Sequence, residues 1–436
     1  MRAEEVAEAM TAAFLSIKKH IREGSSLKSA LYSVSRSMKP SLNALRLARK
    51  MLHLYAIESY RVSSLLRGVI RDEVGSDALI LLTLFITSIR AGVDLGDLED
   101  LARALRRVMK GMWPRDVEPW LGLIRVLPDL EPARGRAPGY PPWFVRMLRR
   151  VLGRGEALRL MAFQDEARPR TYVALNTLIA SAEEVLEEAE RAGVRLSEDG
   201  RVPGLYVLEK AEDTRRLAEL VRRSLLLVQD FSSYYAVYAA RPKPGQLVLD
   251  VCAAPGSKTI LAGLLMRNKG LIISVDSSVR RLYTHLRRVR RAGLRIVEDV
   301  VADATAQLPL SLEADLVILD PPCSSTGLFW REPTYRQLIK PRHVGMFARL
   351  QRKMLESAAS HVRVGGALVY STCSLSLEEN ELLLEDFLKK RPEYELAPID
   401  PALGSPGLRG MDSARRLYPH RDYCNGFFLA KLRRIW

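Results

Sequence analysis

Residues 247–259 have the sequence LVLDVCAAPGSKT, an apolar run followed by small residues and then by a polar stretch that favours a helix. This order is typical of the first strand, turn and helix of a parallel α/β sheet. Small residues let the backbone approach a ligand closely, and the N-terminus of the following helix favours a carboxylate or phosphate. The stretch therefore predicts a ligand-binding loop made of Cys252, Ala253, Ala254, Pro255, Gly256, Ser257 and Lys258.

The alternation of strand and helix continues to the end of the sequence. Helices are expected from Ser257, over 280–293, from about Val344 and over 377–390. The strands between them are expected over 246–251, 270–276, 295–303, 314–320 and 366–373, with two closing runs at 394–400 and 425–432. Repeated βαβ units predict a doubly wound, mostly parallel sheet of seven strands. The last strand follows a loop instead of a crossover helix, so we expect it to be antiparallel.

The preceding sequence divides into two further segments. Apolar residues recur at helical spacing through roughly the first 130 residues, which predicts an all-helical domain over residues 1–135. The Pro- and Gly-rich stretch EPARGRAPGYPPW at 131–143 predicts a linker or boundary. Residues 140–243 mix helices with short strands and predict a small α+β segment, and residues 244–436 form the α/β domain.

Composition restricts the class of protein. The 436 residues include 67 Lys and Arg against 51 Asp and Glu, a net charge of +16 that favours a polyanionic partner such as a nucleic acid, although solubility alone could also explain it. The four cysteines show no CxxC spacing, so we expect no metal site and no disulfide framework. We find neither a signal peptide nor an apolar run long enough to span a bilayer, and we expect a cytoplasmic monomer.

The predicted loop lacks the patterns of two common nucleotide sites. A Walker loop needs glycine where Ser257 and Cys252 stand, and the dinucleotide pattern GxGxxG is absent. Asp276 ends the second predicted strand, where a carboxylate can hold a ribose diol, and Asp303 ends the third, within reach of an adenine. The alternative for each acid is a helix cap.

Two cysteines lie just past two of the predicted strands: Cys323 in LVILDPPCSSTG and Cys373 in GALVYSTCSLSLEEN. In an open α/β sheet, reacting groups gather outside the carboxyl ends of the strands, so these thiols are expected to meet over one substrate. The alternative is two inert, buried cysteines, which is the commoner fate of this residue type. We assign the thiols of Cys252 and Cys424 to packing.

The motifs DVCAAPGSKT, DPPCSSTG, STCS and NGFFLAKL resemble those of the S-adenosylmethionine-dependent RNA cytosine-5 methyltransferases of the RsmB/NOP/Sun family. Upstream, RTYVALNTL and VQDFSSYYA are similar to the leading motifs of that family, and the resemblance covers about residues 140–436. The helical region before them is similar to the NusB-like RNA-binding domain. Ser257 and Ser325 stand where glycine is common in the family, and Asn425 stands where an acid often precedes GFF.

The resemblance implies a reaction and a role for several residues. Cys373 would attack C6 of cytosine and Cys323 would serve release of the product, because C5 becomes nucleophilic only after a thiolate adds. Asp320 would contact the base and the cofactor, and Lys258 would lower the pKa of the attacking thiol, unless Lys258 is simply a solvated helix residue. S-adenosylmethionine would be bound by residues 252–258, Asp276, Asp303 and Asp320.

RNA is the expected partner, either rRNA or tRNA. Two arginine clusters are candidates for contacting its backbone, although charge runs on helices are usually solvated faces: Arg280, Arg281, Arg287, Arg288, Arg290 and Arg291, and upstream Arg146, Arg149, Arg150, Arg154, Arg168 and Arg170. The two alternatives are a DNA cytosine-5 methyltransferase, in which Cys323 would be the nucleophile, and a non-catalytic ribosome-assembly factor that binds RNA.

Overall fold

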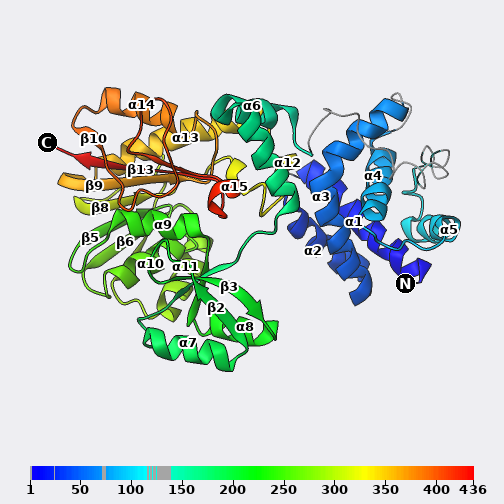
Figure 1. Ribbon diagram of the computed structural model, residues 1–436, viewed down its shortest axis with the longest axis horizontal. Helices are drawn as coiled ribbons and strands as arrows, with labels where there is room; N and C mark the ends of the chain where they lie inside the picture. Colours follow the sequence, from blue (N-terminus) through cyan, green and yellow to red (C-terminus); the bar gives the residue numbers. More distant parts are fainter. Residues whose placement is uncertain are drawn as a thin grey trace. The chain divides into compact units, whose positions relative to one another are not determined.

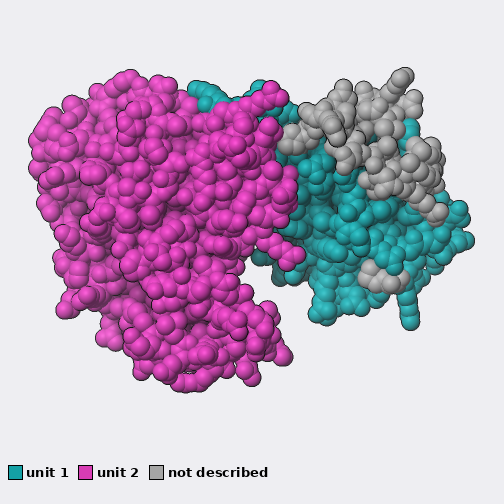
Figure 2. Space-filling model, viewed as in Figure 1, with its two compact units in different colours: residues 1–150, 332–340 teal, residues 151–331, 341–436 magenta. Residues whose placement is uncertain are grey.

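The computed structural model describes residues 2–23, 25–70, 75–114, 117, 120, 124 and 139–436. The chain divides into two units, one of residues 1–150 with 332–340 and the other of residues 151–331 with 341–436, coloured separately in Figure 2. Most of the predicted linker, residues 131–138, lies outside the described residues. Residues 332–340, which the sequence suggested were part of the α/β domain, belong instead to the first unit.

The first unit is helical wherever it is described, as its apolar spacing predicts. In α1, for example, Val6, Met10, Phe14 and Ile17 recur every three or four residues and are all buried in the core of this unit. Figure 1 shows its helices, which are α1 (Ala3–Glu23), α2 (Leu27–Met38), α3 (Leu42–Ile70), α4 (Ser76–Arg90), α5 (Leu98–Met109), the start of α6 (Pro142–Glu166) and the short α12 (Tyr335–Leu338).

Residues 332–340 complete the packing of this helical unit. The fully buried Arg336 lies over the ring of Tyr140, 3.8 Å from its centroid, and donates a hydrogen bond of 2.7 Å to its hydroxyl. Tyr60 in turn donates to the carbonyl of Arg336, and Gln337 donates to the hydroxyl of Ser59 at 2.6 Å. A piece of chain from the middle of the α/β sequence is therefore part of the helical unit.

The second unit begins with a small antiparallel sheet of strand order β2-β3-β1-β4. Helices α7 and α8 connect its strands, so that this part is α+β. Its elements are β1 (Tyr172–Leu175), α7 (Ala182–Arg191), β2 (Val194–Glu198), β3 (Leu205–Ala211), α8 (Thr214–Arg222) and β4 (Leu226–Gln229), followed by α9 (Phe231–Ala240).

The large sheet has a parallel centre of order β9-β8-β5-β6-β7, and its doubly wound class is as predicted (Figure 1). The final strand β13 pairs antiparallel with β9, also as predicted. The described residues 244–436 contribute nine strands instead of the expected seven, because β11 and β12 extend the sheet beyond β13. Its strands are β5 (Leu247–Val251), β6 (Leu271–Asp276), β7 (Val297–Val301), β8 (Ala314–Leu319), β9 (Val362–Thr372), β10 (Tyr394–Ala397), β11 (Ser405–Pro406), β12 (Arg415–Leu417) and β13 (Phe427–Arg434).

Helices cover both faces of this sheet because successive strand residues point in opposite directions. Val248 and Ile318 share one core with residues of α9 and α10, whereas Leu249 and Val317 share another with residues of α13 and α14. The helices that follow β5 along the chain, apart from the short α12, are α10 (Ser257–Leu265), α11 (Val279–Arg291), α13 (Pro341–Ala359), α14 (Glu381–Lys390) and the short α15 (Pro419–Asp422).

The strand order reverses between β5 and β8, and this is the point at which doubly wound sheets bind ligands. In the parallel register Val251 lies beside both Val275 and Leu319, and Leu319 lies beside Tyr370. The residues that follow these positions therefore leave the sheet at the same edge: Cys252, Asp276, Asp320 and Ser371.

Candidate active site

The loop after β5 needs unusual backbone geometry. Cys252 and Gly256 both have positive φ values, 67° and 104°, and a Cβ atom at Gly256 would lie only 2.9 Å from the ring of His285. Helix α11 supports this loop from outside: Arg281 donates a hydrogen bond to the carbonyl of Ala254, and Arg288 donates to the carbonyl of Pro255 and to the hydroxyl of Ser257. The loop is thus held close to α11.

Arg281 and Arg288 are candidates for RNA contact that also donate hydrogen bonds to the loop, and Arg281 is exposed as well. Arg280, Arg287, Arg290 and Arg291 are exposed on the same helix. In the upstream cluster all six arginines are exposed, and the guanidinium of Arg170 lies 4.3 Å from the ring centroid of Tyr423.

Asp276 has the features of a ligand-binding carboxylate. Its side chain is buried, and its Oδ1 accepts a hydrogen bond of 3.0 Å from the backbone N–H of Ser278. Its Oδ2 accepts no hydrogen bond from the described residues, although a guanidinium nitrogen of Arg281 lies 3.2 Å away. The carboxylate lines a small cavity together with Cys252, Ser277, Arg281, Pro322 and Met354.

A buried carboxylate oxygen without a hydrogen-bond donor is costly unless a ligand supplies one. Asp276, next to the small-residue loop, is therefore suited to accept hydrogen bonds from a ribose diol. Doubly wound folds commonly use an acid to hold this group. Asp303 is exposed beyond β7 and does not line this cavity. It accepts a hydrogen bond from the backbone N–H of Thr305, and this bond lowers the pKa of the Asp303 carboxyl.

Cys252 and Cys424 have the environments of packing residues. Sγ of Cys252 lies 3.9 Å from Sδ of Met354, and burial raises the pKa of the Cys252 thiol to about 12. Cys424 is fully buried, and burial raises its pKa as well. Neither sulfur is therefore suited to act as a thiolate nucleophile near neutral pH.

Lys258 and Asp320 form an ion pair at the end of β8. Nζ of Lys258 donates to Oδ2 of Asp320 and, at 3.0 Å, to the hydroxyl of Ser233, while Ser371 donates to Oδ1 of Asp320 at 3.0 Å. The Lys258 side chain is only 12% exposed, which excludes the alternative of a solvated helix residue. Burial opposes its charge, but the neighbouring Asp320 more than offsets this and raises the pKa of Lys258.

The two strand-end cysteines meet. Sγ of Cys323 and Sγ of Cys373 are 2.9 Å apart and both thiols are free, and Cys373 also lies 3.6 Å from the hydroxyl of Ser325. The hydrogen bond between the sulfurs and burial raise the pKa of Cys323 well above its ordinary value. Cys323 therefore stays protonated and can donate its S–H to the sulfur of Cys373.

A buried hydrogen-bond chain lies beneath the loop. Thr259 donates to Asp250 at 2.6 Å and lies 3.0 Å from Nε2 of His285, whose Nδ1 faces Asp299. Burial raises the pKa of Asp250 to about 6. This chain fixes His285 under Gly256 and ties β5 to α11.

Several residues around the site had no role in the sequence prediction: Ser233, Ser371, His285 and Glu379. Ser371 could have been found, because it lies two residues before Cys373 on a predicted strand. Glu379 follows Cys373 by six residues, whereas Ser233 and His285 reach the site from distant parts of the sequence.

Comparison with known proteins agrees with this geometry. Residues 237–433 match the family model described as 16S rRNA methyltransferase RsmB/F. Over 210 residues the chain is 38% identical to the tRNA (cytosine(72)-C(5))-methyltransferase of Pyrococcus horikoshii, an alignment that covers 48% of this chain and 52% of the relative. The chain thus spans about half the length of this curated relative.

Two solved structures share the fold. The crystal structure of PH0851 superimposes with a TM-score of 0.80 at 25% identity and covers 99% of each chain. The structure of NSun6 from Pyrococcus horikoshii with SFG has a TM-score of 0.61 at 25% identity, covering 68% of this chain and 98% of the other. Residues 237–433 are therefore similar to the RsmB/F methyltransferases, and the similarity to PH0851 extends over nearly the whole chain.

Proposed function

We propose that this protein transfers a methyl group from S-adenosylmethionine to C5 of a cytosine in rRNA or tRNA. The observation that carries the proposal is the contact of two free thiols, 2.9 Å apart, beside the Lys258–Asp320 pair at the switch point of the sheet. The similarity of residues 237–433 to the RsmB/F methyltransferases supports the reaction class.

S-adenosylmethionine fits the residues at the loop. It supplies a methyl group on a sulfonium when bound. Asp276 would hold the ribose diol through its free buried oxygen, the backbone of residues 252–258 would face the methionine moiety, and Asp303 would lie near the adenine. The NSun6 relative has SFG, an analogue of S-adenosylmethionine, in its structure, which supports this choice.

The thiols would take different parts in the reaction. Cytosine C5 is a weak nucleophile, so Cys373 would add to C6 as a thiolate and raise the electron density at C5. After methylation the C5 proton is lost and the C6–S bond breaks. Cys323 would then donate its S–H to the departing Cys373 thiolate, in agreement with the raised pKa of Cys323.

Asp320 would bind the base, and Lys258 would hold Asp320 and supply a positive charge to the site. A carboxyl at Asp320 can accept from the exocyclic amine of cytosine. Lys258 holds Asp320 in place, and its positive charge interacts with the sulfur of Cys373.

The helical unit and the exposed arginines would bind the RNA. The net charge of +16 supports attraction to phosphates, and the helical unit is consistent with a NusB-like RNA-binding domain. The target cytosine has to be unstacked to reach the thiols, or lie in a single-stranded region. We place this activity in the cytoplasm.

Bisulfite sequencing of total RNA from cells with and without the protein tests the proposal. We expect one or more cytosines to be protected from conversion only when the protein is present. Unchanged RNA would favour a non-catalytic assembly factor, and modification of DNA instead of RNA would favour the DNA-type enzyme.

A further inference from the structure

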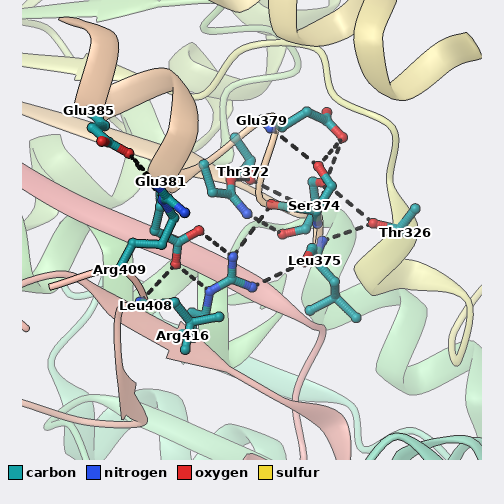
Figure 3. Close-up of polar contacts among 12 residues, drawn as sticks. Thr326, Thr372, Ser374, Leu375, Glu379, Glu381, Glu385, Leu408, Arg409 and Arg416 are labelled. Atoms are coloured by element: carbon teal, nitrogen blue, oxygen red, sulfur yellow. Dashed lines mark hydrogen bonds and ion pairs between the residues drawn. The ribbon is translucent and has the colours of Figure 1, made fainter. Parts of the chain in front are cut away.

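A buried glutamate joins the segments that carry the two thiols. Glu379 directly precedes Asn380, the residue at the start of α14, and its side chain is fully buried. Figure 3 shows it turned toward Ser374, away from Glu385 on α14 and from Arg409.

Each carboxylate oxygen of Glu379 accepts hydrogen bonds, and between them they reach both cysteine segments. On the Cys323 side, the backbone N–H of Ser324 donates to Oε2 at 2.8 Å and the hydroxyl of Ser324 donates to Oε1. On the Cys373 side, the hydroxyls of Ser374 and Ser376 donate to Oε1 at 2.7 and 3.0 Å. Because the two serines Ser324 and Ser374 directly follow the cysteines, the carboxylate links the two loops one residue beyond each sulfur.

Helix α13 adds a third support. The amide of the fully buried Gln351 donates to Oε2 of Glu379 at 2.9 Å and also to the carbonyl of Pro322, the residue before Cys323, at 2.9 Å. The loop of Cys323 is therefore held on both sides of the cysteine.

These donors explain why the residue is an acid. A carboxylate can only accept hydrogen bonds. The hydrogen bonds that Oε1 and Oε2 of Glu379 accept come from uncharged hydroxyl and amide donors. Burying an ionised group without a cation is expensive unless hydrogen bonds compensate it. Two residues further on, the buried Glu381 shows the usual solution, an ion pair with the fully buried Arg416 (Figure 3). The contacts of Glu379 are of another kind: they are hydrogen bonds from neutral groups, and they connect the two cysteine loops with α13.

We propose that Glu379 is a positioning residue that sets the distance between Cys323 and Cys373, so that both sulfurs can act on one pyrimidine. This rests on the methyltransferase function proposed above. The charge of Glu379 has a second effect. The pKa of Cys323 is raised mainly by the hydrogen bond with Cys373 and by burial, and the charge of Glu379 raises it further. Glu379 therefore also helps to keep the proton on Cys323.

The first test measures the sulfur geometry without RNA or cofactor. Diamide oxidises neighbouring thiols to a disulfide and is itself reduced, so the rate of Cys323–Cys373 disulfide formation reports how well the sulfurs are held together. Glu379→Gln should slow this reaction by about tenfold or more, because the effective concentration of the two groups falls. Glu385→Gln, the same change at a partly exposed position of α14, should leave the rate as in the wild type.

The second test measures catalysis by the same variants. Glu379→Gln should lower kcat for methyl transfer by about 10²-fold, the effect of misplacing a reacting group by about 1 Å, while KM for RNA and cofactor affinity change little. Glu379→Asp, which keeps the charge, should recover part of the rate. In the Gln variant, alkylation of Cys323 by iodoacetamide, followed by mass spectrometry, should begin at lower pH than in the wild type.

Milder variants separate positioning from folding if Glu379→Gln is unstable. Ser324→Ala loosens only the Cys323 loop and should cause a covalent protein–RNA adduct to accumulate. Ser376→Ala loosens only the Cys373 loop and should slow adduct formation. Wild-type disulfide and methyl-transfer rates in Glu379→Gln would overturn the inference, whereas a wild-type protein that fails to methylate any RNA would overturn the proposed function and leave the disulfide result standing.

Discussion

At the scale of single residues, the two thiols are expected to fail in different ways. Cys373→Ala should abolish methyl transfer and covalent attachment together, because C5 never becomes nucleophilic without addition at C6. Cys323→Ala should still allow addition and methylation but impair release, which leaves a protein–RNA adduct visible on denaturing gels.

The double variant identifies the attached residue. An adduct that forms in Cys323→Ala and disappears when Cys373 is also changed places the covalent bond on Cys373. The DNA-type arrangement would give the reverse pattern, with the adduct lost at Cys323 and kept when Cys373 is substituted.

Asp276 should contribute measurably to cofactor affinity. Its buried Oδ2, which faces Arg281 but accepts no hydrogen bond from the described residues, can accept one from a ribose hydroxyl, and a charge-assisted hydrogen bond of this kind is worth about 1–3 kcal/mol. Asp276→Ala should weaken binding of S-adenosylmethionine and of its demethylated product by that amount in calorimetry. Undiminished binding, or tighter binding of NAD or ATP by the wild type, would contradict the assignment.

Asp250 should make stability depend on pH. Its pKa is raised by burial to about 6 in the folded protein, so the unfolded chain ionises first as the pH rises. The contribution of Asp250 to the free energy of unfolding is therefore complete below about pH 4 and is lost by about pH 6, a change of roughly 3 kcal/mol for two pKa units. Chemical denaturation of wild type and Asp250→Asn at several pH values measures it: the stability difference should shift in favour of the variant across this interval, and a constant difference would refute the prediction.

At the scale of elements, one edge of helix α11 faces the loop after β5, and another edge is exposed and is expected to face RNA. Arg288 donates hydrogen bonds to the cofactor loop, whereas Arg287 is exposed. Arg288→Ala should weaken cofactor binding by about 1–2 kcal/mol, because two hydrogen bonds that hold the loop are lost. Arg287→Ala should leave cofactor binding unchanged and reduce the salt slope of RNA binding by about one. Equal effects of both variants on both ligands would show that the two edges are not distinct.

The prediction from sequence was most complete where strands and their ends decide the structure. Apolar runs identified the parallel strands, and their common edge brought together Cys323, Cys373 and the Lys258–Asp320 pair. The sequence did not reveal the loop contacts of α11, because a helical spacing of seven places Arg281 and Arg288 on one edge without showing what that edge faces. Ser374 and Ser376 lie five and three positions from Glu379, but its link to the Cys323 loop escaped notice because Ser324 and Gln351 lie 55 and 28 positions away. The extra strands β11 and β12 are too short to show a period.

At the scale of the whole molecule, the net charge of +16 should govern RNA binding. Each neutralised phosphate releases counterions, so the logarithm of the affinity should fall linearly with the logarithm of the salt concentration. With six or more phosphate contacts, affinity should drop by about 10³-fold or more between 50 and 200 mM salt, measured by filter binding or fluorescence anisotropy. Affinity that does not change with salt would show that the arginine clusters are only solvated faces.

Deleting the helical unit is a poorer test of its role in RNA binding than the charge variants. Residues 332–340 belong to that unit, and the buried Arg336 and Gln337 contact Tyr140 and Ser59 within it. A truncated protein would keep these side chains without their partners, so lost binding could follow from damage to the adjoining chain. No helix among the described residues is long and apolar enough to cross a membrane.

The same segment governs the order in which the protein can be assembled on the ribosome. Synthesis proceeds from the N-terminus, and the helices of the first unit emerge early. Their contacts with residues 332–340 cannot form until residue 340 has been translated, by which time most of the parallel sheet has also been made. The N-terminal helices therefore mature together with the catalytic fold, and nascent chains arrested before residue 332 should present them in a protease-sensitive state.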